Sequence, residues 1–184
     1  MESIIKLFDY YKQLGEGAVN QLTNQELFSE TNEFDNSIPV IMKHLWGNML
    51  SRWTDFLETD GEKTWRKRDE EFIDTLIDRE DLMKKWSEGW VCLFNALNNI
   101  TDEDLIDRKV KIRNQDHSIM EAIHRQLAHY AYHVGQIVFI AKHIKGKAWK
   151  SLSIPKNQSE SFNQNKFNNK PSDHFTDDFR TNKL

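Results

Sequence analysis

Two histidines, His129 and His133, have the residue type and spacing that most directly suggest chemistry in this sequence. They lie four positions apart in the stretch HRQLAHYAYHVGQI, residues 124–137. On an α-helix, side chains at positions i and i+4 share one face, with Cβ atoms about 5–6 Å apart. Each imidazole can give one ring nitrogen to a metal ion at about 2.0–2.1 Å. The spacing therefore predicts that both residues bind the same ion.

A third ligand must come from another segment, and His44 is the candidate. It lies between Ile41 and Leu45 in a stripe of apolar residues, so we expect it on the inner side of a separate helix. The alternative is that the histidines are neutral and hydrogen-bonded within a core. An HExxH protease motif is absent, since Tyr130 follows His129. The ExxH motif of di-iron bundles is also absent.

The remaining four histidines are expected to be structural or surface residues. His124 precedes His129 by five positions, which places it about 140° round a helix and away from the pair. The others lie in a polar connection, near a helix end and in the C-terminal tail: His117, His143 and His174.

Four helical segments are expected to position these side chains, because the chain has only three prolines and seven glycines and its apolar residues recur at helical spacing. Ser37 can cap the second helix, and Ser118 with Glu121 forms a capping box before the fourth. Gly146 follows the last apolar turn. The predicted fold is an all-α, four-helix bundle with helices over about residues 2–22, 38–56, 78–99 and 119–144.

Three segments outside these helices need separate interpretation. Residues 59–71 are polar and charged, and we expect a surface connection with a solvated face. The alternating KVKIR, residues 109–113, predicts a short hairpin or an extended crossover. Residues 151–184 are rich in Asn, Ser, Lys and Asp, and we expect an irregular tail that packs its Phe side chains on the bundle or on a second copy. The expected division is a bundle over residues 1–150 and a tail over residues 151–184.

Composition excludes several classes of function. A formal net charge of −4 argues against a nucleic-acid surface, which needs clustered Lys and Arg. No apolar run approaches the roughly 20 residues that span a bilayer, and the N-terminus has no signal-peptide pattern. The single cysteine, Cys92, fits a reducing compartment. We therefore expect a cytoplasmic protein with neither nucleic acid nor membrane as partner.

Two motifs resemble those of a known superfamily. IMKHLWGNMLSRW (41–53) and RQLAHYAYHVGQI (125–137), followed by WKSLSIP (149–155), resemble the DinB-like, or DinB/YfiT, superfamily of small metal-binding four-helix bundles. The resemblance covers about residues 1–160 and is closer to a bacillus-type subgroup of unknown function. It implies that His44, His129 and His133 bind a divalent metal ion, commonly zinc or nickel.

The same resemblance suggests how the site is completed. Gln136, in the HxGQ pattern after His133, is expected to hydrogen-bond a metal-bound ligand or to orient a histidine. Gly135 is expected to allow close helix approach. Three neutral imidazoles leave at least one open position on a dication, which is typical of reactive rather than structural sites.

Some relatives in the superfamily are transferases that use low-molecular-weight thiols such as bacillithiol or mycothiol. The resemblance thus implies that the metal activates a thiol cosubstrate, whose sulfur attacks a small electrophile. Asn48, Arg52 and Arg125 are candidates for substrate binding, because an arginine can hold a carboxylate by a bidentate contact. For either arginine the alternative is an ordinary surface position. No residue identifies itself as a general base, so the catalytic residues are unknown.

The sequence alone does not decide whether the chain is an enzyme. One alternative is a non-catalytic metal- or ligand-binding bundle in stress response or in protein interaction. Another is metal-dependent hydrolysis of a small substrate by a bound water. A homodimer is expected from the resemblance.

Overall fold

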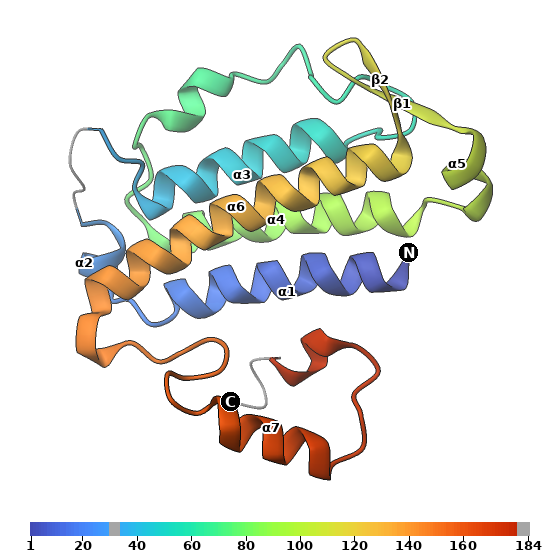
Figure 1. Cartoon of the computed structure of the whole chain (residues 1–184). Helices are drawn as coiled ribbons and strands as arrows, with labels where there is room; N and C mark the ends of the chain where they lie inside the picture. The colour runs from blue at the N-terminus through green and yellow to red at the C-terminus, as the bar shows by residue number, and fades with distance from the viewer. Residues whose placement is uncertain (30–33, 180–184) are drawn as a thin grey trace. The chain divides into compact units, whose positions relative to one another are not determined.

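The computed structural model of the chain describes residues 1–29 and 34–179. Helices predominate in this part of the chain, which confirms the mainly helical class, while the four-helix bundle stays a prediction. The α-helices are α1 (Glu2–Val19), α2 (Asn24–Leu27), α3 (Ile38–Trp53), α4 (Arg79–Asn98), α5 (Asp102–Asp107), α6 (Ile119–Lys145) and α7 (Ser159–Asn168) (Figure 1). Three short 3₁₀ helices are η1 (Arg68–Phe72), η2 (Gly146–Ala148) and η3 (Phe175–Asp178).

The start of α3 follows the predicted capping. The Ser37 hydroxyl accepts a hydrogen bond from the amide of Val40 at 3.3 Å, and Pro39 occupies the first turn. The helix ends at Trp53, a turn earlier than the apolar stripe suggested. These features bring His44 near the middle of α3.

The predicted capping box also forms at the start of α6. The amide of Ser118 donates to the Glu121 carboxylate at 2.7 Å, and the amide of Glu121 donates to the Ser118 hydroxyl at 3.1 Å. Past the other end of α6, Gly146 has a φ of 52°, the left-handed conformation that glycine adopts at little cost. The histidine pair is therefore held on a long, well-bounded helix.

The segment before α6 is a hairpin rather than a crossover. Strands β1 (Lys109–Ile112) and β2 (Gln115–Ser118) pair antiparallel. Arg113 and Asn114 connect them, and both have positive φ, as a two-residue type I′ turn requires. The Asp60 carboxylate accepts hydrogen bonds from both turn amides, at 2.8 and 2.6 Å, and so ties the turn to the connection after α3.

One compact unit of the chain is Asn24–His133, and it contains α3, α4, the hairpin and the first half of α6. Helices α3 and α4 lie side by side within it (Figure 1). Its core is rich in aromatic and long aliphatic side chains, which include Leu45, Met49, Trp53, Trp86, Trp90, Leu93 and Tyr130.

The second compact unit is formed by Met1–Thr23 with Val134–Leu184. The expectation of an irregular tail is wrong here, because α7 and η3 form within it. The rings of Phe175 and Phe179 lie 6.0 and 6.1 Å from the ring of Tyr10 on α1, and Phe162 stacks on Phe179. These aromatic contacts join the segment to α1 within this unit. Residues 180–184 of the tail lie outside the described part.

Among residues 1–29 and 34–179, no helix combines the length and the apolar character that crossing a membrane requires.

Candidate metal centre

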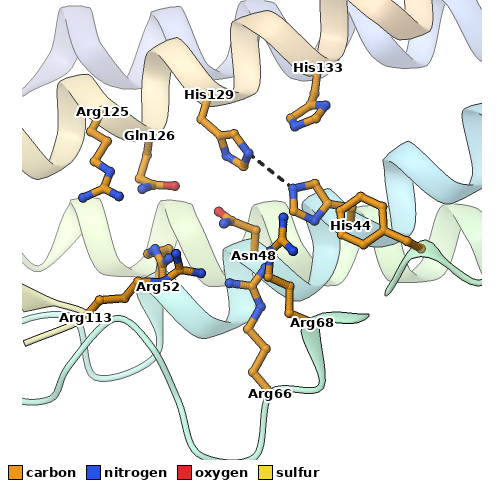
Figure 2. A pocket seen from close by; sticks show the side chains of 11 residues that line it. His44, Asn48, Arg52, Arg66, Arg68, Arg113, Arg125, Gln126, His129 and His133 are labelled. Atoms are coloured by element: carbon orange, nitrogen blue, oxygen red, sulfur yellow. Dashed lines mark hydrogen bonds between the residues drawn. The ribbon is translucent and has the colours of Figure 1, made fainter. Parts of the chain in front are cut away.

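The three predicted ligands converge within the Asn24–His133 unit. One ligand atom from each of His44, His129 and His133 lies within 4.8 Å of the others. Nε2 of His44 is 3.3 Å from Nε2 of His129, as the dashed line in Figure 2 shows. Two nitrogens bound to one tetrahedral ion at about 2.0–2.1 Å lie about 3.4 Å apart, so this pair has the spacing that shared coordination needs.

Helix geometry accounts for the convergence. His129 and His133 lie one turn apart on α6 and point toward α3, where His44 faces them (Figure 2). His44 is only 4% exposed and belongs to the buried stripe of α3, as the sequence predicted. The pair on α6 is partly exposed, so the cluster lies at the edge of the core and solvent can reach it.

The protonation of His129 also suits metal binding. Burial, followed by the neighbouring His133 and His44, lowers its pKa from 6.5 to about 3. The imidazole is therefore neutral near pH 7, which is the form that donates a lone pair to a metal ion.

Glu71 is a buried partner of the centre that the sequence analysis missed. Its Oε2 lies 2.9 Å from Nδ1 of His44. Burial alone would raise the pKa of Glu71, but the hydrogen bonds with His44 and Arg66 lower it below its ordinary value. An ionised Glu71 can only accept, so Nδ1 of His44 carries the proton and Nε2 keeps its lone pair toward His129. Such carboxylate partners commonly fix the tautomer and ring orientation of metal-binding histidines.

Arg66 and Gly47 hold Glu71 in place. Arg66 donates from Nε to Oε1 at 2.8 Å and from Nη2 to Oε2 at 2.9 Å, and its side chain is 2% exposed. Gly47 follows His44 by three positions on α3, and a Cβ added there would lie 2.3 Å from Glu71 Oε1. The missing side chain at this position lets the carboxylate approach the helix backbone.

These contacts correct the expectation that residues 59–71 form a solvated face. The segment follows α3 closely, and its Arg66 and Glu71 side chains are buried against the histidine site. The sequence signal was ambiguous, since charged residues in a turn-rich stretch are normally exposed. Only the return of the chain along α3 shows that two of them are internal.

Asn48 is buried one turn after His44 and is fixed by a hydrogen-bonded chain. The indole N–H of Trp53 donates to the Tyr130 hydroxyl at 2.9 Å, and this hydroxyl donates to Asn48 Oδ1 at 3.0 Å. Since Asn48 Oδ1 accepts from Tyr130, the amide nitrogen of Asn48 is the atom that can donate to a ligand in the adjacent pocket. The prediction that Asn48 lies beside the site is consistent with this geometry.

A pocket of about 360 Å³ opens beside the histidines. It is lined by the three histidines, by five arginines and by Asn48, Phe72 and Gln126 (Figure 2). Both arginines expected from the sequence, Arg52 and Arg125, belong to this lining. Arg52 is not at the surface: it is 5% exposed and bonds to the carbonyl of Gly61 and to Glu62.

The predictions for Gln136 and Gly135 have different outcomes. Gln136 is not among the residues that line the pocket, and its assistance to the centre stays a prediction. At Gly135 an added Cβ would meet no described atom within 4 Å, so the expected close helix approach is wrong. The sequence cannot distinguish a glycine that a neighbour requires, such as Gly47, from one that stands open.

The remaining histidines lie apart from the cluster. His124 and His143 are exposed on α6. His117 on β2 lies 3.3 Å from a guanidinium nitrogen of Arg125. In the second unit, His174 caps η3 and contacts the Ser3 hydroxyl. None of the four belongs to the three-histidine group.

The chain is mainly helical, and three converging imidazoles beside an open pocket could hold a metal ion. The chain belongs to a family of proteins of unknown function, DUF1572, whose model matches residues 1–158. No curated protein and no solved structure matches the chain.

Proposed function

We propose that this chain binds a divalent metal ion, zinc or nickel, through His44, His129 and His133. We further propose that the centre serves the transfer of a low-molecular-weight thiol, of the bacillithiol type, to a small electrophile. The observation that carries the proposal is the convergence of three imidazoles within 4.8 Å at the mouth of a pocket. The motif resemblance to the DinB-like superfamily supports the choice of reaction.

The composition of the cluster favours a reactive site. Within the described residues, the group holds three histidines and no cysteine or carboxylate as a fourth member. Structural zinc sites normally complete four protein ligands, whereas catalytic sites leave a position for water or substrate. When bound, a divalent ion supplies Lewis acidity that lowers the pKa of a coordinated water or thiol.

The chain's own residues have three tasks in this proposal. Glu71 keeps the Nε2 lone pair of His44 directed at the site, since it accepts a hydrogen bond from Nδ1–H of His44. Asn48 presents an amide to the pocket, fixed by Tyr130. The arginines of the lining bind the acidic groups that small cellular thiols carry. No described residue is assigned as a general base.

The wider setting is part of the same proposal. The resemblance supports a DinB-like four-helix bundle and a homodimer, and the single cysteine supports a cytoplasmic location. The negative net charge argues against nucleic acid as a partner, and the resemblance supports a small-molecule substrate.

Metal stoichiometry provides the first test. Purified full-length chain should hold about one equivalent of zinc or nickel after loosely bound ions are removed. Substitution of His44, His129 or His133 by Ala should abolish this metal binding. The helix should persist because alanine is the better helix former. His124→Ala, an exposed histidine on the same helix, is the matched control. A full metal equivalent in His133→Ala would defeat the three-histidine assignment.

Turnover assays then separate the reaction classes. Saturable consumption of an electrophile that needs both metal and added thiol is the expected result. Turnover without thiol would indicate metal-dependent hydrolysis instead. Stoichiometric metal with no turnover of any electrophile would indicate a non-catalytic binding or stress-response protein.

A further inference from the structure

The pocket beside the three histidines carries an unusual concentration of positive charge. Arg52 comes from α3, Arg113 from the hairpin turn and Arg125 from α6, and all reach the same space (Figure 2). Arg66 and Arg68 reach it from the connection and from η1. Residues that are distant in sequence meet here, and among the described residues the lining contains no carboxylate.

Nearby acids neutralise only part of this charge. Glu62 contacts Arg52 and Arg113 at 3.2 and 3.0 Å, and Glu71 contacts Arg66 at 2.8 Å. Arg125 has no carboxylate partner among residues 1–29 and 34–179; its bonded neighbour there is His117. Arg68 reaches Asp69 only at 4.0 Å, and Asp69 is fully exposed. The cluster therefore keeps a net positive charge near pH 7.

Two buried polar atoms of the lining also lack a partner. Arg52 Nε and Gln126 Oε1 have no hydrogen bond within the part of the chain that the structure describes. Both residues are at least nine-tenths buried. A buried polar atom left unsatisfied destabilises the fold, so such atoms normally have a partner in the functional state. A ligand in the pocket would supply that partner.

We propose that this pocket is an oxyanion-recognition site for a small molecule with at least two negative charges, held by Arg68 and Arg125 at the entrance and by Arg52 deeper in. The charges are those of a phosphate or of two carboxylates, which guanidinium groups bind through paired hydrogen bonds. Gln126 Oε1 accepts from a hydroxyl or amine of the same molecule.

This inference rests on the proposed function in one respect, namely that the anion is the substrate or cosubstrate of the metal centre. The size of the pocket, about 360 Å³, fits a small metabolite and is too small for a macromolecule. The anionic groups would anchor the molecule while its reactive atom lies beside the imidazoles. The arginines are then specificity-determining residues.

The test is calorimetric titration of the full-length chain with inorganic phosphate and with succinate. Both probes are multiply charged near pH 7, and low ionic strength, about 0.05 M, limits screening. Titrations use the chain as purified and after metal removal, with helix content monitored by circular dichroism. Saturable binding of at least one probe in both forms is expected.

Variants then identify the pocket. Arg68→Gln and Arg125→Gln, both exposed positions, should each weaken binding about tenfold, the loss expected for one charge-assisted contact. Lys84→Gln, an exposed residue of α4 outside the pocket, removes one positive charge and should change affinity by less than about twofold. Tighter binding of phosphate would indicate a phosphorylated molecule, and tighter binding of succinate a dicarboxylate.

Failure of this proposal differs from failure of the metal centre. Equal affinity in Arg125→Gln and Lys84→Gln, or no saturable binding of either probe, overturns the anion site even where metal is stoichiometric. If the chain holds no metal as purified and still binds a probe through the arginines, the anion site is supported and the proposed metal centre is contradicted.

Discussion

At the scale of single residues, the centre depends on a chain of contacts from Arg66 through Glu71 to His44. Each member is buried, and the two guanidinium–carboxylate bonds of 2.8 and 2.9 Å leave Glu71 little freedom. The carboxylate then fixes which nitrogen of His44 is protonated. The affinity of the centre for a metal ion would therefore depend on Glu71, which does not bind the ion itself.

Glu71→Gln tests this dependence. The substitution keeps the shape of the side chain but removes its charge and one of its two accepting oxygens. The amide NH2 then faces a donor of either His44 or Arg66, so the arrangement that orients His44 is weakened. We expect metal affinity to fall about 10–100-fold, as for other second-layer carboxylates. Competition with a chromophoric chelator measures it. Glu70→Gln, next to it but exposed, should bind metal like the wild type. Equal affinity in both variants would contradict a positioning role for Glu71.

A pair of glycines offers a second test at this scale. Gly47→Ala places a Cβ only 2.3 Å from Glu71 Oε1 and should therefore displace the carboxylate. We expect about 1–3 kcal/mol of destabilisation and weaker metal binding. Gly135→Ala, which meets no described atom, should instead stabilise the helix by about 0.5–1 kcal/mol. Urea unfolding measures both, and equal effects would contradict the packing described.

At the scale of elements, the β1–β2 hairpin positions one of the pocket arginines. Its turn contains Arg113, and Asp60 binds the turn through the amides of Arg113 and Asn114. Asp60 also accepts from the amide of Glu62 at 2.7 Å. One carboxylate thus joins the connection after α3 to the turn that precedes α6.

Asp60→Asn should loosen this junction in a pH-dependent way. Burial opposes ionisation of Asp60, but the three backbone donors lower its pKa below the ordinary 3.8. A lowered folded-state pKa means that the carboxylate stabilises the fold above pH 3.8 and that this is lost as pH falls through the folded value.

At pH 7 we expect Asp60→Asn to lower Tm by about 2–4 °C, equivalent to about 1 kcal/mol, with the difference from wild type shrinking in acid. Thermal unfolding at neutral and acidic pH checks this. Asp69→Asn, fully exposed, is the control. A constant difference at every pH would mean that the charge of Asp60 is not involved.

At the scale of the whole molecule, the C-terminal segment is an ordered part of the unit it shares with α1. Phe179 joins the two, since its ring stacks on Phe162 at 5.9 Å and lies 6.1 Å from Tyr10. Phe179→Ala should cost about 1–2 kcal/mol, or about 2–8 °C in Tm. Phe167→Ala, 86% exposed on α7, should be within about 0.5 kcal/mol of wild type. Similar losses in both variants would contradict the aromatic contact.

The same contacts bear on the proposed homodimer. They lie within one chain, so the tail has a partner without a second copy. We expect a chain truncated after Pro155 to keep the oligomeric state of the full-length chain in analytical sedimentation, although it unfolds at lower temperature. Loss of dimers on truncation would show that the tail reaches across to the partner.

Much of the local structure was predictable because its causes are local. The caps at Ser37 and at Ser118 with Glu121 depend on residues within one turn, and the helices begin where these residues predict. The pair His129 and His133 shares a face by helix periodicity alone. His44 was predictable as a buried residue because its apolar neighbours share its face.

The rest depended on segments that are distant in sequence. Glu71 lies 27 positions from His44, and no local pattern distinguishes it from its exposed neighbour Glu70. The ordered tail depended on aromatic contacts with Tyr10, which isolated phenylalanines in a polar stretch do not predict.

The sequence by itself determined the main helices, the caps of α3 and α6 and the metal-binding spacing of His129 and His133, because periodicity and capping act within a few residues. Only the tertiary structure decided that Glu71 and Arg66 are internal and that five arginines share one pocket with the imidazoles. The physical reason is that burial and charge pairing depend on which segments meet in space. Short-range preferences of the chain carry no information on that.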